Sequence, residues 1–396
     1  MRKKNGYTLI ELLIAMAIFT IVVIISTTAF DRIITASRAQ TKTAESQIGG
    51  IVGLGLMRFD VEHAGYGLPW SFQAPLTYPE AADVALADGI ETDSFNDSNI
   101  PAAVDATHIP KPVSSGTSTS TGIDYLVVKS VINSISSTGR KWSFVNYSAN
   151  GIVNLSTIKL WTNASDNFTA GDNIITLNNI DNQKTNSLAT RQLATDGTDY
   201  YYPYAGLAPA DDLYKPVNPT QLYTVYGVDR EALRMPYNRA DFYVSSSNVP
   251  SFCSPGTGVL TKGVVNHGTG ADAGQFTQYP LLDCVGDMQV AYELDLSNNG
   301  NLTYTKTLDT YSAQQVRDSL KRVRIYILAH EGRKDRGFNY PVPDADKAVV
   351  VGDPAFTVSF GRTWTSGQMA DRFGADWRKY RWKIYTLMVK PSNMNN

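Results

Sequence analysis

The pattern of apolar positions separates a long N-terminal segment from a remainder built of short apolar runs. From Tyr7 to Phe30 the chain is apolar, and Glu11 is its only charged residue. As a helix this stretch would be about 36 Å long, enough to cross a bilayer core of about 30 Å. The first proline is Pro69. The pattern therefore predicts one helix over residues 7–64, with residues 7–30 in a membrane.

The second half of this predicted helix carries apolar residues at helical spacing, and we expect that stripe to pack under a sheet. Four glycines also lie there, each weakening a helix by about 1 kcal/mol. They indicate either a bend or the close approach of another backbone, and the pattern does not choose between the two. The stripe is Ile48, Ile51, Val52, Gly55 and Phe59, and the glycines are Gly49, Gly50, Gly53 and Gly55.

Residues 65–396 have the pattern of a β-rich head, so the predicted fold class is α+β. Short β-branched and aromatic runs between Gly, Asn or Pro indicate strands, and Ser312–Leu320 is the one clear later helix. Connectors are expected at Pro69–Pro101 and Pro110–Gly122, with Ser114–Thr121 mobile. The predicted strands are Tyr125–Lys129, Ile174–Leu177, Leu222–Val228, Met288–Leu294, Val323–Leu328 and Trp382–Val389.

Charge orients the chain and narrows the classes of partner. Arg2, Lys3 and Lys4 precede the apolar stretch, so the N-terminus stays cytoplasmic and the head is delivered across the membrane. The net charge is −2 with no clustered basic excess, so no nucleic-acid surface is expected. In an oxidising space Cys253 and Cys284 would pair; the alternative is two unrelated buried thiols.

Two ordinary explanations of the N-terminus fit poorly. A secretory signal peptide has a shorter apolar region followed by a small-residue cleavage site, and no convincing site follows Phe30. An ordinary membrane anchor does not account for Glu11, because a carboxylate inside the span costs about 2.5–3.5 kcal/mol. Such an acid should have a partner.

The order of a basic leader, Gly6, the aromatic Tyr7 and then Thr-Leu-Ile-Glu11 resembles the class III signal of type IV pilins and type II secretion pseudopilins. The resemblance implies that prepilin peptidase cuts after Gly6 and that the new amino group of Tyr7 is methylated. It also implies that Glu11 neutralises the cationic N-terminus of a neighbouring subunit, a pairing whose loss costs several kcal/mol. Major pilins usually have a proline where Thr28 stands, which favours a minor subunit.

Three further sequence segments resemble the PilW-like minor pilins of the type IV pilus: Arg58–Gly67, Asp124–Lys129 and Leu281–Asp295. That resemblance implies a pilin-like fold with a leader over residues 1–6, the helix over 7–64 and a periplasmic head over 65–396. The implied role is pilus assembly, priming or the tip complex, first in the inner membrane and then at the cell surface. The implied partners are prepilin peptidase, other minor and major pilins, and the inner-membrane assembly platform.

Two alternatives remain open. A J-type minor pseudopilin of a type II secretion system shares the signal and the helix, although such heads are usually much smaller. A tip adhesin would use an aromatic cluster that binds glycans or a partner surface, although such residues are more often packing. That cluster is Tyr200, Tyr201, Tyr202 and Tyr204, continuing through Tyr214, Tyr223 and Tyr226.

No motif for catalysis, a cofactor or a metal stands out. None of the four histidines, His63, His108, His267 and His330, has a partner at zinc-like spacing, and His330-Glu331 is expected in a solvated loop. Asp295 to Gly300 match the opening of a calcium loop, but the closing acid would fall at Lys306. A hairpin turn explains the same residues. We therefore expect no enzyme and no bound cofactor or metal.

Overall fold

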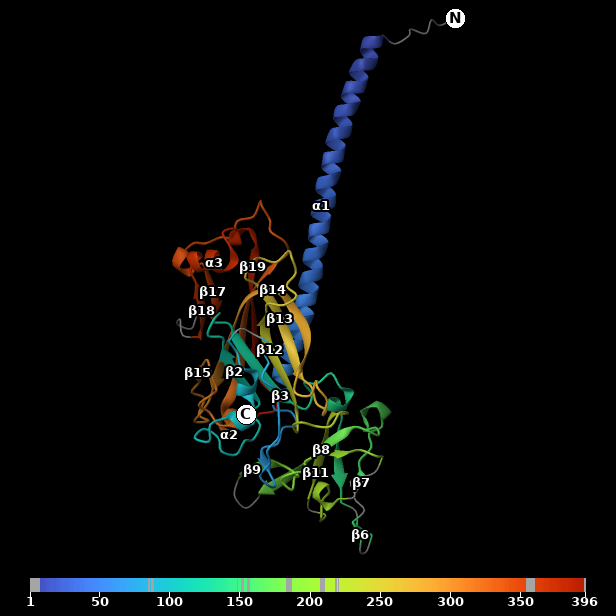
Figure 1. Cartoon of the computed structure of the whole chain (residues 1–396), viewed down its shortest axis with the longest axis vertical. Coiled ribbons are helices and arrows are strands. Elements are labelled where there is room, and N and C mark those ends of the chain that lie inside the picture. Colours follow the sequence, from blue (N-terminus) through green and yellow to red (C-terminus); the bar gives the residue numbers. More distant parts are fainter. Residues whose placement is uncertain are drawn as a thin grey trace, which may run out of the picture.

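A single helix, α1 (Leu9–Glu62), projects from the head as a continuous rod of 54 residues (Figure 1). At 1.5 Å per residue it is about 81 Å long. Its bounds fall within two residues of the predicted 7–64 at each end. The computed structural model describes residues 8–84, 86, 89–147, 149–150, 153–154, 157–182, 187–206, 211–217, 219, 221–353 and 360–394, and describes the backbone alone at 32, 35–48, 149–150, 153–154, 180–182 and 187–190.

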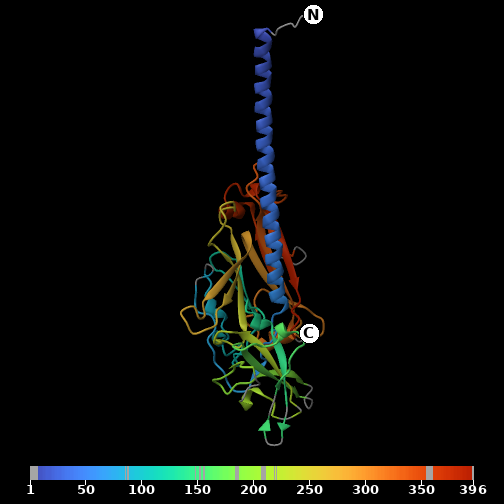
Figure 2. The ribbon, with the colours of Figure 1, turned by 90° about the vertical axis from the view of Figure 1, so that its right-hand side faces the viewer.

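The second half of α1 lies along an antiparallel eight-stranded sheet, which we call the proximal sheet (Figure 2). The helix and the inner face of this sheet enclose the main hydrophobic core, which includes Met57, Val61, Met288 and Ile325. In spatial order its strands are β19 (Arg381–Val389), β16 (Leu320–Glu331), β14 (Phe276–Leu294), β13 (Gly258–Val265), β12 (Asn238–Ser245), β3 (Asp124–Ser130) and β2 (Val113–Thr117), with β15 (Thr303–Thr305) beside β14.

The opposite face of the proximal sheet is covered by two separate segments. At one end, the hairpin β17 (Val349–Gly352) and β18 (Gly361–Trp364) and the helix α3 (Ser366–Phe373) pack on β14, β16 and β19 around Trp364, Phe373 and Trp382. At the other end, the connector over residues 73–112 covers β3 and β12, where Phe95 stacks on Tyr125 at 5.3 Å. The short helix α2 (Ala313–Ser319) leads directly into β16.

A second, seven-stranded sheet forms a distal lobe beyond the C-terminal end of α1 (Figure 1). Its pairs are antiparallel except that β1 runs parallel to β9. Its strands are β1 (Ser71–Phe72), β9 (Ser187–Leu193), β8 (Asn173–Asn182), β11 (Tyr223–Asp229), β4 (Trp142–Asn146) and β7 (Thr157–Ile158), with β10 (Tyr202–Pro203) beside β8, and β5 (Ala149–Asn150) pairs with β6 (Val153–Asn154) nearby.

Short 3-10 turns punctuate the connections, and most are capped by a side chain of the preceding residue. Asp211, for example, accepts a hydrogen bond from the backbone N–H of Leu213 at the start of η5. The turns are η1 (Thr92–Phe95), η2 (Asp97–Asn99), η3 (Ser137–Arg140), η4 (Ala164–Asp166), η5 (Asp212–Tyr214), η6 (Ala345–Lys347) and η8 (Trp377–Lys379).

The α+β fold class is confirmed, and each predicted strand lies in or overlaps an observed one. One prediction of the connector is wrong. The segment Ser114–Thr121 was expected to be mobile, but residues up to Thr117 form the edge strand β2 against β3, with Ser114 and Ser115 buried. An edge strand beside the core needs backbone pairing more than large side chains, so a serine-rich sequence suffices. The helix α3 was not predicted.

Candidate functional site

The N-terminus of α1 is closed by its own side chains. Thr8 is the N-cap residue, and its hydroxyl accepts a hydrogen bond from the backbone N–H of Glu11 at 3.4 Å. The Glu11 carboxylate in turn accepts hydrogen bonds from the backbone N–H of Thr8 at 2.8 Å and from its hydroxyl at 3.0 Å. This reciprocal arrangement is a capping box, which satisfies amides that a helix start leaves free. Glu11 is thus folded back onto the helix end.

The capping box provides hydrogen bonds for Glu11 but no positive charge. Among the described residues, both of its accepted hydrogen bonds end on the same oxygen, Oε2. A carboxylate in an apolar span is tolerated when it meets a cation. The helix therefore presents a preformed acid, held at a fixed place, that still favours a cationic partner.

The first half of α1 is apolar around its whole circumference, and no other described residue of the chain packs against it. Over Leu9–Asp31 the mean hydropathy is 2.8, and none of this stretch is buried inside the molecule. Its threonines do not oppose an apolar environment, because the hydroxyls of Thr20 and Thr27 donate to the carbonyls of Met16 and Val23 at 2.8 and 2.9 Å. This half of the helix therefore requires lipid or other apolar helices around it.

The second half of α1 buries a different face from the one that the sequence indicates. The expected stripe is wrong at Ile51, Val52 and Phe59, which are 68%, 59% and 40% exposed, and the side chain of Ile48 lies outside the described part of the chain. The face of α1 that packs on the sheet contains glycines, and these small residues let the two backbones approach more closely than bulky side chains would. The residues that face the proximal sheet are Gly50, Gly53, Leu54, Met57, Asp60, Val61 and Ala64.

At Gly53 the backbone of α1 lies directly against the backbone of β14. A Cβ atom there would lie 2.0 Å from the carbonyl oxygen of Leu281 in β14, and at Gly50 it would lie 2.7 Å from the side chain of Leu282. Gly49 and Gly55 have nothing within 4 Å. Of the two explanations open from the sequence, the close approach of another backbone holds at Gly53.

The segment Arg58–Gly67 forms the junction between the helix α1 and the head. Asp60 is buried and pairs with Lys262 Nζ at 2.6 Å; burial raises the pKa of Asp60 and the lysine offsets only part of that rise. Gly65 and Gly67 have positive φ of 81° and 68°, which turns the chain so that the Gly65 N–H donates to the Lys129 carbonyl at 3.0 Å. These residues fix the direction in which α1 leaves the head.

The remaining apolar face of the second half of α1 is left exposed beside the head. Leu56 is 51% exposed and lies on the same outer side as Ile51, Val52 and Phe59. These four side chains form an apolar patch on the part of α1 that the sheet supports. An exposed apolar patch of this kind indicates an interaction site.

Among the residues expected to act in processing and assembly, Gly6 and Tyr7 lie outside the described residues, and Glu11 lies in the first turn of α1. The sequence interpretation missed Thr8, the other member of the capping box, although the Thr-x-x-Glu spacing over residues 8–11 was a sufficient signal.

Comparison with known proteins identifies a family motif at the N-terminus of the chain. Residues 1–27 match the family model of the prokaryotic N-terminal methylation motif. The chain begins with a prepilin-type motif. Such a motif implies processing by prepilin peptidase, and together with the apolar helix it is consistent with anchoring in a membrane.

No curated protein matches the chain. A type IV-like pilin from Thermus thermophilus is similar over 40% of this chain and 80% of its own, with 14% identity and a TM-score of 0.18. At that TM-score the similarity does not indicate a function, and the function is inferred from the geometry of this chain.

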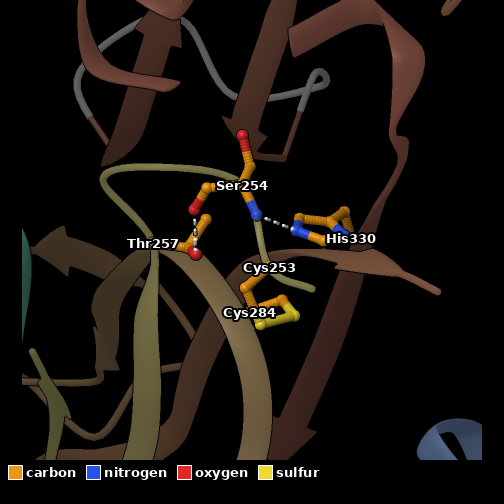
Figure 3. Close-up of a disulfide and its surroundings, with 5 residues drawn as sticks. All are labelled: Cys253, Ser254, Thr257, Cys284 and His330. Carbon is orange, nitrogen blue, oxygen red and sulfur yellow. Dashed lines mark hydrogen bonds between the residues drawn. A yellow bond between two sulfur atoms is a disulfide. The ribbon is translucent and has the colours of Figure 1, made fainter. Parts of the chain in front are cut away.

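The two cysteines of the head are joined. The Cys253–Cys284 disulfide ties the loop before β13 to the middle of β14 (Figure 3). Cys284 lies at a bulge of β14, with a positive φ of 56° and a register shift immediately after it. A ring nitrogen of His330 lies close to the two sulfur atoms, and such atoms could together hold a metal ion. However, both sulfur atoms are used by the disulfide, so they are not thiolate ligands here.

The prediction that His330 lies in a solvated loop is wrong. His330 is in β16, only 2% exposed, and packs between the rings of Tyr380 and Trp382. Its Nε2 accepts the backbone N–H of Ser254 at 2.8 Å, next to Cys253 (Figure 3). The strand β16 runs three residues past the predicted end at Leu328 because β19 pairs with it there, with His330 opposite Trp382 and Glu331 opposite Arg381.

We expect His330 to make the head sensitive to acid. Burial lowers the pKa of His330 to about 4, against about 6.5 in the unfolded chain. Between these pH values the unfolded chain binds the additional proton, so folding stability falls as the pH falls from about 6.5 to about 4. The full difference is about 3 kcal/mol relative to a non-titrating residue.

The matched comparison is His330→Gln, which retains a hydrogen-bond acceptor. The free energy of unfolding should be measured with denaturant in detergent at pH 4 to 7 for both proteins, with the disulfide intact. The two curves should diverge below pH 6.5, with the wild type losing more. Parallel curves would show that His330 is protonated as easily in the folded head as in the unfolded chain.

Other sequence candidates have structural roles. Asp295 accepts the backbone N–H groups of Asn299 and Gly300 at 3.1 and 2.9 Å, which is the hairpin turn between β14 and β15. His267 is buried, and its Nδ1 accepts the N–H of Arg234 at 3.1 Å. In the aromatic cluster the following are buried and pack within the distal lobe: Tyr200, Tyr202, Tyr204, Tyr214 and Tyr223.

Proposed function

We propose that the chain is a minor pilin, a filament subunit of a type IV pilus that acts in pilus assembly, priming or the tip complex. One observation carries the proposal. The first half of α1 is apolar around its whole circumference, has none of the described residues of the head packed on it, and carries one acid, Glu11, three residues after its N-cap residue. The prepilin-type motif over residues 1–27 supports it. In this account prepilin peptidase removes residues 1–6 and methylates Tyr7, leaving the head in the periplasm.

The arrangement of α1 suits side-by-side packing of subunits. Before assembly the first half of α1 is held in lipid. In a filament the same surface packs against the helices of other pilins, and the exposed face that includes Ile51, Val52 and Leu56 extends that contact alongside the head. Glu11 then meets the amino group of a neighbouring subunit's Tyr7, which supplies the charge that its capping box lacks.

The position of the distal lobe favours the tip. It extends beyond the last turn of α1, away from the membrane-spanning end (Figure 1). In a filament the helices point their N-termini toward the membrane, so a lobe at the other end of α1 would meet the next subunit farther from the membrane. At the tip there is no such subunit, and the lobe would have room. The burial of the tyrosine cluster gives no support to a glycan-binding surface there.

The test is the incorporation of a Glu11→Gln variant into pili. The amide keeps the size of the side chain and one oxygen that can accept the Thr8 hydrogen bonds, but it removes the charge that pairs with a neighbour. Loss of a buried charge pair costs about 3–5 kcal/mol, so the amount in sheared pili should fall by more than about a hundredfold. Cleavage and membrane insertion should be normal. Thr27→Val, a neutral change in the same span, is the control and should incorporate as wild type does.

Incorporation of Glu11→Gln at the wild-type level would contradict the pairing. Recovery of the wild type in pili, measured in the same fractions, distinguishes a pilus subunit from a J-type pseudopilin, which would be absent from them.

A further inference from the structure

Behind the proximal sheet, on the side away from α1, the connector over residues 73–112 buries a lysine between two carboxylates. The Nζ atom of Lys129 in β3 lies 2.8 Å from Glu80 Oε2 and 2.8 Å from Asp97 Oδ1. All three side chains are at most 1% exposed. The Lys129 ammonium also donates to the Phe95 carbonyl at 3.1 Å. A lysine so completely removed from water is rare in proteins and invites a chemical explanation.

The Asp97 carboxyl group is held and polarised by donors. Its Oδ2 accepts hydrogen bonds from the phenols of Tyr237 at 2.6 Å and Tyr78 at 3.1 Å. Its Oδ1, the oxygen next to Lys129, accepts the backbone N–H of Lys111 at 3.2 Å. Donors aimed at one carboxyl oxygen stabilise negative charge that develops there, as in an oxyanion hole.

Glu80 is placed between the amine and the backbone of Asp97. Its Oε1 accepts the N–H of Asp97, which fixes the carboxylate. Its other oxygen, Oε2, is buried and has no hydrogen bond of ordinary geometry among the described residues, although Lys129 Nζ lies beside it. This oxygen is therefore positioned to take a proton from Lys129.

The charges nearby leave one negative charge in excess. Arg239 and Asp241 form an ion pair, with two hydrogen bonds at 2.8 and 2.7 Å, and Tyr125 donates to Asp241 at 2.6 Å. Arg239 also lies 3.7 Å from Glu80 Oε2, so two cations, Lys129 and Arg239, face the three carboxylates of Glu80, Asp97 and Asp241. Burial, and then the charge of Glu80, raise the pKa of Asp97 to about 6, so a fraction of its carboxyl group is neutral near neutral pH.

We propose that Lys129 and Asp97 condense to form an intramolecular amide cross-link, with Glu80 as the proton acceptor. Lys129 passes one ammonium proton to Glu80, and the free amine attacks Cγ of the protonated Asp97. The new N–C bond forms, one C–O bond breaks, and the departing hydroxyl leaves as water after taking a second proton from the nitrogen. No oxidant or activated co-reactant is needed.

The product suits the site better than the reactants do. An ammonium, a carboxylate and a carboxylic acid become an amide, a neutral Glu80 and water, which leaves the charges of Arg239 and Asp241 to balance each other. Removing buried charges relieves a desolvation cost of several kcal/mol per ion, and a dry site disfavours the reverse hydrolysis. The bond would tie the connector that follows α1 to β3, across the back of the proximal sheet.

The test is peptide mapping of the full chain, purified from membranes in detergent, reduced and digested with a protease that cleaves after aromatic residues. Cleavage after Phe95 and Tyr125 separates Asn96–Tyr125, which contains Asp97, from the peptide that contains Lys129. We expect these two peptides joined, with a mass lower than their sum by one water. Both peptides recovered free at their sequence masses would overturn the proposal.

Two controls accompany this measurement. Lys141 and Asp172 form another ion pair, at 2.7 Å, but a second carboxylate does not contact Lys141 in the described residues. Lys141 lies in the same peptide as Lys129, so the control is the peptide of residues 169–200, which contains Asp172 and should be recovered free. Glu80→Gln cannot take the proton and should leave the Lys129 and Asp97 peptides unlinked while the Cys253–Cys284 disulfide still forms. Cross-linking of that variant to the wild-type level would overturn the role of Glu80.

Discussion

Replacing Gly53 with alanine is expected to destabilise the docking of α1 on the head by about 3 kcal/mol, the upper part of the usual range for overpacking. The added Cβ would lie 2.0 Å from the carbonyl oxygen of Leu281, and 2.7 and 2.8 Å from that residue's carbonyl carbon and Cα. All three are backbone atoms of β14, so no side-chain rotation can relieve the contact. The helix has to move away from the sheet, and the core around Met57 and Val61 opens with it.

The same substitution at Gly55 provides the matched control. Nothing lies within 4 Å of the Cβ position there, and alanine is favoured over glycine in a helix by about 1 kcal/mol. Denaturant unfolding in detergent should therefore rank the proteins Gly55→Ala, wild type, Gly53→Ala, from most to least stable. Equal stability of the two variants would contradict the close packing of α1 on β14.

Replacing Gly6 with leucine is expected to abolish processing, so that the full-length precursor accumulates in the membrane. Residues 1–27, which include Gly6, match the prepilin-type motif. In the proposed processing prepilin peptidase cuts after Gly6, and leucine would place a bulky side chain at that cut. The measurement is the size of the membrane-bound protein on a gel. Gly55→Ala, which leaves residues 1–27 unchanged, should be processed fully. Normal processing of the Gly6 variant would contradict the peptidase assignment.

The parts of the fold that depend on local sequence were predictable. The helix α1 follows from an unbroken apolar run and the absence of proline before Pro69, and its observed bounds differ little from the prediction. The strands that were predicted are those whose own residues are strongly β-branched or aromatic, such as β3 and β19. The strand β14 was predicted only over its second half, because Pro280 and the bulge at Cys284 interrupt the pattern in the first half.

The errors arise where packing overrides hydrophobicity. The bulkiest apolar residues in the second half of α1 face outward, since the sheet requires glycine at the closest contact and leaves Ile51 and Val52 for other partners. His330 is polar by type, yet it is buried against Tyr380 and Trp382. Neither outcome can be read from one segment, because each depends on a strand far away in the sequence.

The candidate sites also differ in whether local sequence was enough to predict them. Glu11 and its setting are local, and the Thr8 capping box could have been read from four consecutive residues. The Lys129 site could not, because Glu80, Asp97 and Tyr237 come from two connectors and are brought to β3 only by the fold. In the sequence they are isolated charged and aromatic residues without a motif.

The N-terminal residue of the protein, isolated from membranes and from sheared pili, tests the central claim most directly. N-terminal sequencing and mass spectrometry should find Tyr7 first, with a methylated amino group and residues 1–6 absent. A mature protein that begins at Met1, with the leader retained, would contradict the account of α1 as a processed filament helix.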